Sequence, residues 1–237
     1  MESVSKPYEL IVLQPNVFSL HFEGKHHYAL HQMVQLIKQH IPELIEVTNT
    51  FNRINLFTKN GLSTARLLTE LSEIDFSSCL NFSPSQIWEL PICFDASFST
   101  DLHDVFCGDQ TKINSYHKAF LETIFTLEFY GFLPGFGYLS GLPRSLHLDR
   151  KKNPAKALIP GAVAIGGEQV GVYPQKSPGG WQCIGNSPVP WINFDKKPPV
   201  FMQPGEGIRF VEIDLKRHSE ITLAVEMNVY KPICLTL

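Results

Sequence analysis

The sequence has no run of apolar residues that approaches the roughly 18 needed to cross a membrane. Its first seven residues do not lead from a basic segment into an apolar segment, as a secretory leader would. We therefore expect a cytoplasmic protein with no membrane partner.

Positive charge is also scarce. Lys and Arg number 20 against 23 Asp and Glu, which gives a net charge of −3, and the basic residues are spread thinly. The one short basic run, Arg150-Lys151-Lys152, precedes Asn153-Pro154 and is typical of a solvated turn. Because domains that bind nucleic acid usually carry an evident basic patch, we expect no nucleic-acid partner.

Cysteine and histidine do not occur at metal-ligand spacing. The five cysteines are widely separated and form no Cys-x-x-Cys pair, and His26-His27 has no further ligand nearby in the sequence. We expect reduced structural thiols, no disulfide and no metal site.

The first 80 residues alternate between the period of strands and that of helices. Strand-like runs occupy residues 8–13, 17–22, 44–48 and 53–58, and helical periodicity occupies residues 27–41 and 63–74. The order ββαββα predicts a small α/β sandwich in which two helices cover one face of an antiparallel sheet.

Residues 81–85 are polar, contain a proline and indicate a linker, so we expect domains at residues 1–85 and 86–237. After two short helical stretches at 102–106 and 112–121, the second domain is rich in strand-sized segments separated by Pro and Gly. These segments are residues 157–159, 162–165, 170–173, 181–184, 207–213 and 221–229. The pattern predicts a β-barrel or a closed β-sandwich, and the fold class of the chain is then α+β.

Residues 128–139 combine Gly and Pro with large aromatic side chains. The spacing is that of neither a P-loop nor a dinucleotide-binding loop. Pro134-Gly135 fits the central positions of a type II turn, and burial of Phe132, Phe136 and Tyr138 would hold that turn rigid. This first corner is either purely structural or faces a ligand.

Residues 172–185 form a second segment of the same kind, with Ser177-Pro178-Gly179-Gly180-Trp181 at its centre. Two consecutive glycines allow a ligand or a neighbouring backbone to approach closely, and Tyr173 and Trp181 could form the apolar walls of a pocket. The alternative is a β-hairpin turn with a buried Trp.

Few polar groups are available to such a pocket. They are Asp101, His117, Arg150, Gln169, Tyr173 and Ser177. His117 is either a general base or a structural residue. No Ser-His-Asp arrangement, carboxylate pair or metal cluster can be assembled, so the chain is expected to supply only part of a catalytic site.

The two corners together resemble the KipI-like family, which includes the B-type subunit of 5-oxoprolinase and subunit 1 of allophanate hydrolase. The family pattern Gly-Phe-x-Pro-Gly-Phe-x-Tyr-Leu is matched by Gly131, Phe132, Pro134, Gly135, Phe136, Tyr138 and Leu139. The pattern Tyr-Pro-x-x-Ser-Pro-Gly-Gly-Trp is matched by Tyr173, Pro174, Ser177, Pro178, Gly179, Gly180 and Trp181. The family's preceding His falls on His117.

The resemblance implies a ferredoxin-like α/β sandwich followed by a cyclophilin-like β-barrel. It implies that the matched residues of both corners, from Gly131 to Tyr138 and from Tyr173 to Trp181, bind substrate together with Gln169. His117 and Arg150 are the candidate catalytic residues.

The resemblance also implies a subunit of an ATP-dependent 5-oxoprolinase, which converts 5-oxo-L-proline to L-glutamate. The expected partners are a homologous KipA-like protein, which is the C-type subunit, and a LamB/YcsF-type subunit. The chain is expected to be inactive without its partner, and ATP to belong to the complex and not to this chain alone. Alternatives are a KipI-type histidine-kinase inhibitor, or the carboxyltransferase half of a urea carboxylase or allophanate hydrolase-type system.

Two positions depart from the family pattern. The family usually has Pro-Arg-x-x-x-Pro-Arg, but here Arg150 is kept and Ala155 replaces the second Arg. The family's Ile-Gly-Arg-Thr-Pro becomes residues 184–188, with Asn186 in place of Arg. A charge-assisted hydrogen bond to carboxylate or phosphate is worth about 1.5–3 kcal/mol. These changes weaken the case for retained catalysis, unless the lost cations are structural or a partner supplies the charge.

Overall fold

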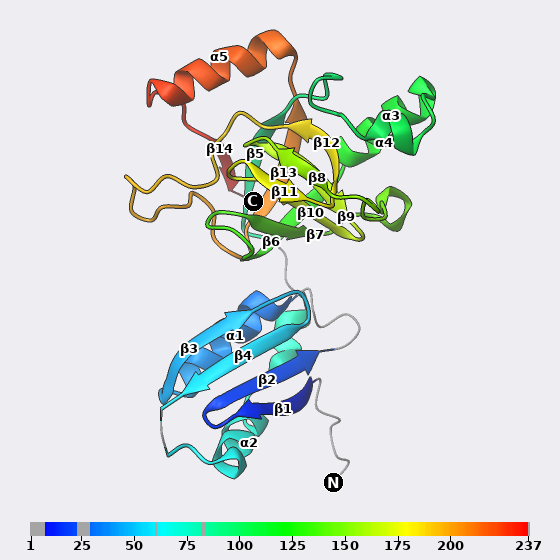
Figure 1. Ribbon diagram of the computed structural model, residues 1–237. Helices are drawn as coiled ribbons and strands as arrows, with labels where there is room; N and C mark the ends of the chain where they lie inside the picture. Colours follow the sequence, from blue (N-terminus) through cyan, green and yellow to red (C-terminus); the bar gives the residue numbers. More distant parts are fainter. Residues whose placement is uncertain (1–7, 23–28, 60, 82–83, 237) are drawn as a thin grey trace. The chain divides into compact units, whose positions relative to one another are not determined.

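The computed structural model describes residues 8–22, 29–59, 61–81 and 84–236 (Figure 1). The chain divides into two compact units, Met1–Ser83 and Pro84–Leu237. The first seven residues and His26-His27, about which the sequence analysis made predictions, lie outside the described residues.

The first unit is a four-stranded antiparallel sheet packed against helices, with strand order β1-β2-β4-β3. Its elements are β1 (Tyr8–Gln14), β2 (Val17–Phe22), α1 (Leu30–His40), β3 (Leu44–Asn49), β4 (Arg53–Thr58), α2 (Thr64–Ser72) and the 3-10 helix η2 (Phe76–Asn81). Met33 of α1 and Leu67 of α2 are fully buried in one core with the sheet, as the helical periodicity predicts. The order ββαββα differs from the βαββαβ order of ferredoxin-like folds, so that part of the prediction is wrong.

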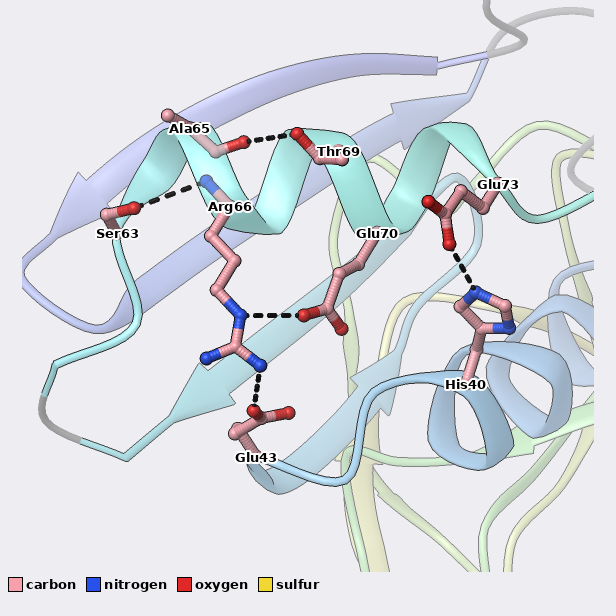
Figure 2. Close-up of polar contacts among 8 residues, drawn as sticks. All are labelled: His40, Glu43, Ser63, Ala65, Arg66, Thr69, Glu70 and Glu73. Atoms are coloured by element: carbon pink, nitrogen blue, oxygen red, sulfur yellow. Dashed lines mark hydrogen bonds and ion pairs between the residues drawn. The ribbon is translucent and has the colours of Figure 1, made fainter.

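Polar contacts fix the start of α2 in this unit (Figure 2). The backbone N–H of Arg66 donates to the Ser63 hydroxyl over 3.2 Å, which caps the helix. The Arg66 guanidinium pairs with Glu70 one turn later at 2.9 Å, and also with Glu43, which precedes β3. Because Arg66 is exposed, these pairs orient the helix but contribute little stability.

The second unit is built mainly from sheet, with an eight-stranded sheet of order β12-β9-β10-β7-β6-β13-β5-β14 and a two-stranded sheet β11-β8. Its strands are β5 (Gln86–Ile92), β6 (Ile124–Tyr130), β7 (Gly137–Ser140), β8 (Ala155–Leu158), β9 (Ala162–Gly166), β10 (Gln169–Val172), β11 (Ser177–Gly179), β12 (Gln182–Asn186), β13 (Gly207–Glu212) and β14 (Ile233–Thr236). Its helices are α3 (Leu102–Val105), α4 (Gln110–Leu121), the 3-10 helix η3 (Arg144–Leu146) and α5 (Leu215–Glu226).

The described strands do not close into a barrel, so the predicted cyclophilin-like barrel is wrong as regards closure. The outermost strands of the large sheet, β12 and β14, do not pair with each other. The sheet does curl, because Cys93 just after β5 forms a bridge with Asn186 at the end of β12. Among the described residues, this bridge alone joins the two sides, since β14 already occupies the edge of β5 from Gln86 to Glu89.

Helix α5 also contradicts the prediction, which gave residues 221–229 as a strand. The side chain of Asp214 accepts the backbone N–H of Arg217 over 2.7 Å and thereby starts the helix. The segment from Ile221 to Val225, rich in apolar and β-branched residues, has the composition of a strand, but in the structure Ile221 is buried and Leu223 is exposed. No helix in the described part of the chain is both long and apolar enough to span a membrane.

All five cysteines are free. Cys79, Cys93 and Cys183 are buried, while Cys107 and Cys234 are exposed. Among the described residues, no group of three or more His, Cys, Asp or Glu could hold a metal ion.

Candidate functional site

A cavity of about 310 Å³ lies where the two Gly/Pro/aromatic corners meet in the second unit. Five of its ten described lining residues are aromatic, and one carries a charged side chain. The lining residues are Phe132, Phe136, Tyr138, Arg150, Pro154, Tyr173, Pro178, Gly179, Gly180 and Trp181. We call it the Arg150 cavity. All of these residues except Pro154 are site candidates from the sequence.

The first corner is the predicted type II turn. The backbone N–H of Phe136 donates to the carbonyl of Leu133 over 2.9 Å, and Gly135 has a φ of +82°. A Cβ at Gly135 would lie 2.6 Å from the Cβ of Ile192, so the position requires glycine for space as well as for backbone angle. The prediction of this turn is confirmed.

Phe132 and Phe136 play different parts in this corner. The expectation that Phe132 is buried is wrong, because its side chain is 63% exposed and its φ is +62°. A positive φ at a bulky residue is strained and is typical of functional sites. Phe136 is fully buried and meets the ring of Tyr173 edge-on at 5.0 Å. Phe136 therefore holds the corner, while Phe132 stands exposed in the cavity lining.

The second corner depends on the close approach of Tyr173 to Gly179. Strand β11 pairs with β8, and Gly179 lies opposite Ala155. A Cβ at Gly179 would lie 2.3 Å from the Tyr173 hydroxyl oxygen. The glycine therefore admits a side chain of the protein itself. Trp181 is buried and packs edge-on against Phe136 at 5.6 Å. Because β11 pairs with β8 and β12 pairs with β9, the predicted alternative of a β-hairpin turn is wrong.

Arg150 supplies the positive charge of the cavity. Its guanidinium carbon lies 5.7 Å from the centroid of the Trp181 ring, a cation–π distance. Among the described residues no carboxylate lies within ion-pair distance of it, so it can bind an anionic group. Burial raises the pKa of Tyr173 to about 12, against a smaller opposing effect of Arg150. Tyr173 is therefore a protonated hydroxyl at neutral pH and can donate a hydrogen bond.

A buried ion pair beside Arg150 fixes the segment that carries it. The ammonium of Lys151 lies 2.5 Å from a carboxylate oxygen of Asp101, and both side chains are mostly buried. The same Asp101 oxygen accepts the backbone N–H of Cys183 over 2.6 Å. The backbone N–H of Lys151 donates to the carbonyl of Gly180 over 2.7 Å. These contacts tie the Arg150 segment to both ends of the Gly180–Cys183 stretch and hold Arg150 near Trp181.

The structure does not bring His117 to this cavity. His117 lies in α4, and its ring stacks on Phe94 with 3.9 Å between centroids and 7° between planes. Burial lowers its pKa to about 4, so the imidazole is neutral at pH 7. This environment is that of a packed structural histidine.

Other candidates also lie outside the cavity lining. Gln169 begins β10 and pairs with Gly166, and Ser177 is buried in β11 with its hydroxyl donating to the carbonyl of Pro178 over 3.3 Å. The backbone of the first corner, at Gly131, Pro134 and Gly135, shapes the cavity without lining it. Pro174 lines a neighbouring cavity.

The structure shows the surroundings of the two residues that depart from the family pattern. Ala155 lies in β8 opposite Gly179, partly buried. Asn186 is buried and its side-chain amide donates to the carbonyl of Pro160 over 2.8 Å. Neither position offers a cation, so Arg150 is the sole charged residue among the described residues that line the cavity.

The residues that line the neighbouring cavity include several that sequence reasoning missed, above all His218 and Thr222 of α5. They were missed because the helix itself was read as a strand. The Asp214 cap three residues before Arg217 is the signal that could have revealed it.

Comparisons with known proteins show the family of the chain. Residues 14–202 match the family described as "Carboxyltransferase domain, subdomain C and D". Over 169 residues the chain is 31% identical to the B-type subunit of 5-oxoprolinase from Haemophilus influenzae, covering 71% of this chain and 79% of the relative.

Two solved structures show the same fold. The crystal structure of TTHA0988 superposes with a TM-score of 0.67 and 27% identity over 83% of this chain, but the chain spans only 39% of that protein. The urea amidolyase of Kluyveromyces lactis covers all of this chain with a TM-score of 0.74 at 14% identity, and 17% of its own length is matched. At that identity the likeness concerns the fold alone.

Proposed function

The chain belongs to the family of the carboxyltransferase domain, subdomains C and D, and within that family it is similar to the B-type subunit of 5-oxoprolinase. We therefore propose that it is a subunit of an ATP-dependent 5-oxoprolinase. The enzyme would convert 5-oxo-L-proline to L-glutamate in the cytoplasm. Its partners would be a homologous KipA-like protein, the C-type subunit, and a LamB/YcsF-type subunit, without which this chain is inactive.

The observation that carries the proposal is one cation set in an aromatic cavity. 5-Oxoproline is a small, flat lactam ring with one carboxylate. Arg150 matches that carboxylate in charge, and Tyr138 and Trp181 contribute apolar aromatic surface to the lining. The protonated hydroxyl of Tyr173 can donate to a carbonyl or carboxylate oxygen. In this proposal the chain binds and orients the substrate and keeps water away from one of its faces.

The residues of the cavity do not fit a nucleotide. A triphosphate with its magnesium ion needs several cations or backbone N–H groups and an acidic ligand, whereas the described lining offers one Arg and no carboxylate. We therefore propose that ATP binds to a partner subunit and that the lactam is activated there. The lining also contains no group suited to be a general base, since Tyr173 stays protonated at neutral pH.

A carboxyltransferase role is the second candidate, favoured by the family to which the chain belongs, which is described as a carboxyltransferase domain. In that role the cavity would hold the acceptor of the carboxyl group. The two roles differ in what the complex must contain, because carboxyl transfer requires a biotin-bearing partner and 5-oxoproline cleavage does not.

The test is reconstitution. The full chain is expressed with the KipA-like and LamB/YcsF-type proteins of its own genome, and glutamate release from 5-oxo-L-proline is measured with and without ATP. We expect release that needs ATP and all subunits. No release in any combination contradicts the proposal, and recovery of a histidine kinase in place of these subunits in a pull-down supports the regulatory alternative.

A further inference from the structure

A second cavity, of about 300 Å³, shares Tyr173 with the Arg150 cavity but opens among different residues. One wall is helix α5, and the remaining walls come from four other segments, which contribute Phe98, residues 159–161, residues 173–174 and residues 186–191. The lining residues are Phe98, Ile159, Pro160, Gly161, Tyr173, Pro174, Asn186, Ser187, Pro188, Val189, Pro190, Trp191, His218, Thr222 and Val225. We call it the His218 cavity. None of these described lining residues is Asp, Glu, Lys or Arg.

Helix α5 presents one face to this cavity. His218, Thr222 and Val225 follow one another at spacings of four and three residues, which places them on one side of the helix. The hydroxyl of Thr222 is already engaged, because it donates to the carbonyl of His218 over 2.9 Å. The imidazole of His218 is therefore the polar group that α5 brings to the cavity.

The hydrogen bonds of Asn186 determine which nitrogen of His218 carries the proton. The amide nitrogen of Asn186 donates to the carbonyl of Pro160 over 2.8 Å, which fixes the orientation of the amide. The amide oxygen then faces Nε2 of His218 at 2.8 Å and can only accept. Nε2 therefore carries the proton and Nδ1 keeps its lone pair. The Phe98 ring, 4.6 Å from the imidazole, packs against it.

His218 is an uncharged acceptor in this setting. Burial lowers its pKa below the ordinary value, which favours the neutral imidazole at pH 7. Nδ1 has no hydrogen-bond partner among the described residues. The indole nitrogen of Trp191, in the same lining, also has no partner among the described residues, but it is fully buried and a ligand cannot reach it. Nδ1 of His218 is not among the fully buried polar atoms, and an accessible unpaired acceptor in a lining of Pro, Val, Ile and aromatic side chains is typical of a ligand site.

We infer that the His218 cavity is a second ligand site, which binds a small uncharged ring molecule whose O–H or N–H donates to Nδ1 of His218. The apolar walls bind the body of the ring, and Nδ1 of His218 selects for a donor. Anions are disfavoured because no cation lines the cavity. The inference does not depend on the proposed 5-oxoprolinase activity, since Arg150 takes no part in this site.

The test uses three probes of similar shape with the full chain: phenol, toluene and benzoate. Binding is measured by ligand-observed NMR titration. One hydrogen bond is worth about 1 kcal/mol, so phenol should bind about five- to tenfold more tightly than toluene. Benzoate should bind much more weakly than phenol. Equal affinity of phenol and toluene, or preference for benzoate, overturns the inference.

Variants assign the binding to this cavity. His218→Phe keeps a ring against Phe98 and removes Nδ1, so phenol binding should fall to the level of toluene. Thr222→Leu reduces the free volume from a position on the helix surface and should weaken both probes. Ser219→Ala, at the next residue and outside the lining, is the control and should change neither. Unchanged phenol binding in both His218→Phe and Thr222→Leu overturns the inference.

The tautomer is measured independently of any ligand. Long-range ¹H–¹⁵N correlation spectra of the imidazole ring distinguish a protonated Nε2 from a protonated Nδ1. We expect His218 to show protonated Nε2 and unprotonated Nδ1 at pH 7. The opposite tautomer removes the acceptor and contradicts the inference.

Discussion

The guanidinium carbon of Arg150 lies 5.7 Å from the centroid of the Trp181 indole ring. This contact joins two segments, the loop before β8 and the second Gly/Pro/aromatic corner. The indole is held by burial against Phe136, and the backbone next to Arg150 is held by the Lys151–Asp101 pair. The charge and the aromatic wall of the Arg150 cavity are therefore fixed before a ligand arrives, which reduces the entropic cost of binding.

The second corner predicts a contrast between two adjacent glycines. Gly179→Ala places a methyl group against the Tyr173 hydroxyl and should destabilise the protein by about 1–3 kcal/mol. Gly180→Ala, whose nearest foreign atom would be 3.8 Å away, is the matched control and should be close to neutral. Urea denaturation of both variants measures the difference. Equal stability of the two variants contradicts the close approach of Tyr173 to Gly179.

The ion pair beside Arg150 predicts a positioning role for Asp101. Asp101→Asn leaves Lys151 without its carboxylate and should cost about 2–3 kcal/mol, at the low end for a buried pair because both side chains keep some exposure. Asp104→Asn, at an exposed position of α3, is the control. Because Arg150 is then less firmly held over Trp181, anion binding should weaken as well. A loss of stability with unchanged binding of 5-oxo-L-proline to the assembled complex assigns Asp101 a structural role alone.

Because the backbone at Phe132 is left-handed, we expect one substitution there to have opposite effects on stability and on ligand binding. Phe132→Gly relieves the strain of a positive φ and should stabilise the protein by roughly 0.5–1 kcal/mol. The same change removes an exposed aromatic side chain from the cavity lining and should weaken ligand binding. Thermal unfolding and calorimetric titration of the complex measure the two effects. If Phe132→Gly is less stable than wild type, the claim that the backbone at Phe132 is strained is contradicted.

The lowered pKa of His117 should make the stability of the protein depend on pH. Its pKa is about 4 when folded and near 6.5 when unfolded, so its contribution is complete above pH 6.5 and is lost as the pH falls towards 4. His117→Phe keeps the stacking on Phe94 without the titration. Between pH 7 and pH 4 this variant should gain about 1–2 kcal/mol relative to wild type, a value reduced for the partial exposure of the ring. Urea denaturation at both pH values measures the free energy of unfolding of the two proteins. The same change from pH 7 to pH 4 in wild type and in His117→Phe contradicts the prediction.

Local rules account for most of what the sequence could predict. The Pro134-Gly135 turn follows from backbone angles that only these residues adopt readily, and the hydrophobic period of the first unit correctly places Met33 and Leu67 in the core. In each case the decisive physics lies within a few residues of the chain.

The failures involve contacts between distant segments. Whether the sheet closes depends on β14 reaching the edge of β5 from far along the chain, which no local pattern encodes. Helix α5 was misread because its apolar run fits either period, and only the Asp214 cap distinguishes the two. Likewise, the absence of His117 from the cavity and the presence of His218 in the neighbouring one both follow from tertiary packing.

The central claim is that Arg150 binds the substrate anion, and one measurement tests it most directly. In the reconstituted complex, ATP-dependent glutamate release from 5-oxo-L-proline is compared for wild type, Arg150→Gln and Arg150→Lys, with Lys152→Gln as an exposed neighbouring control. Loss of one charge-assisted hydrogen bond should raise the KM of Arg150→Gln about tenfold or more, with partial rescue by Lys and no change in the control. An active complex in which Arg150→Gln keeps the wild-type KM and kcat contradicts the account.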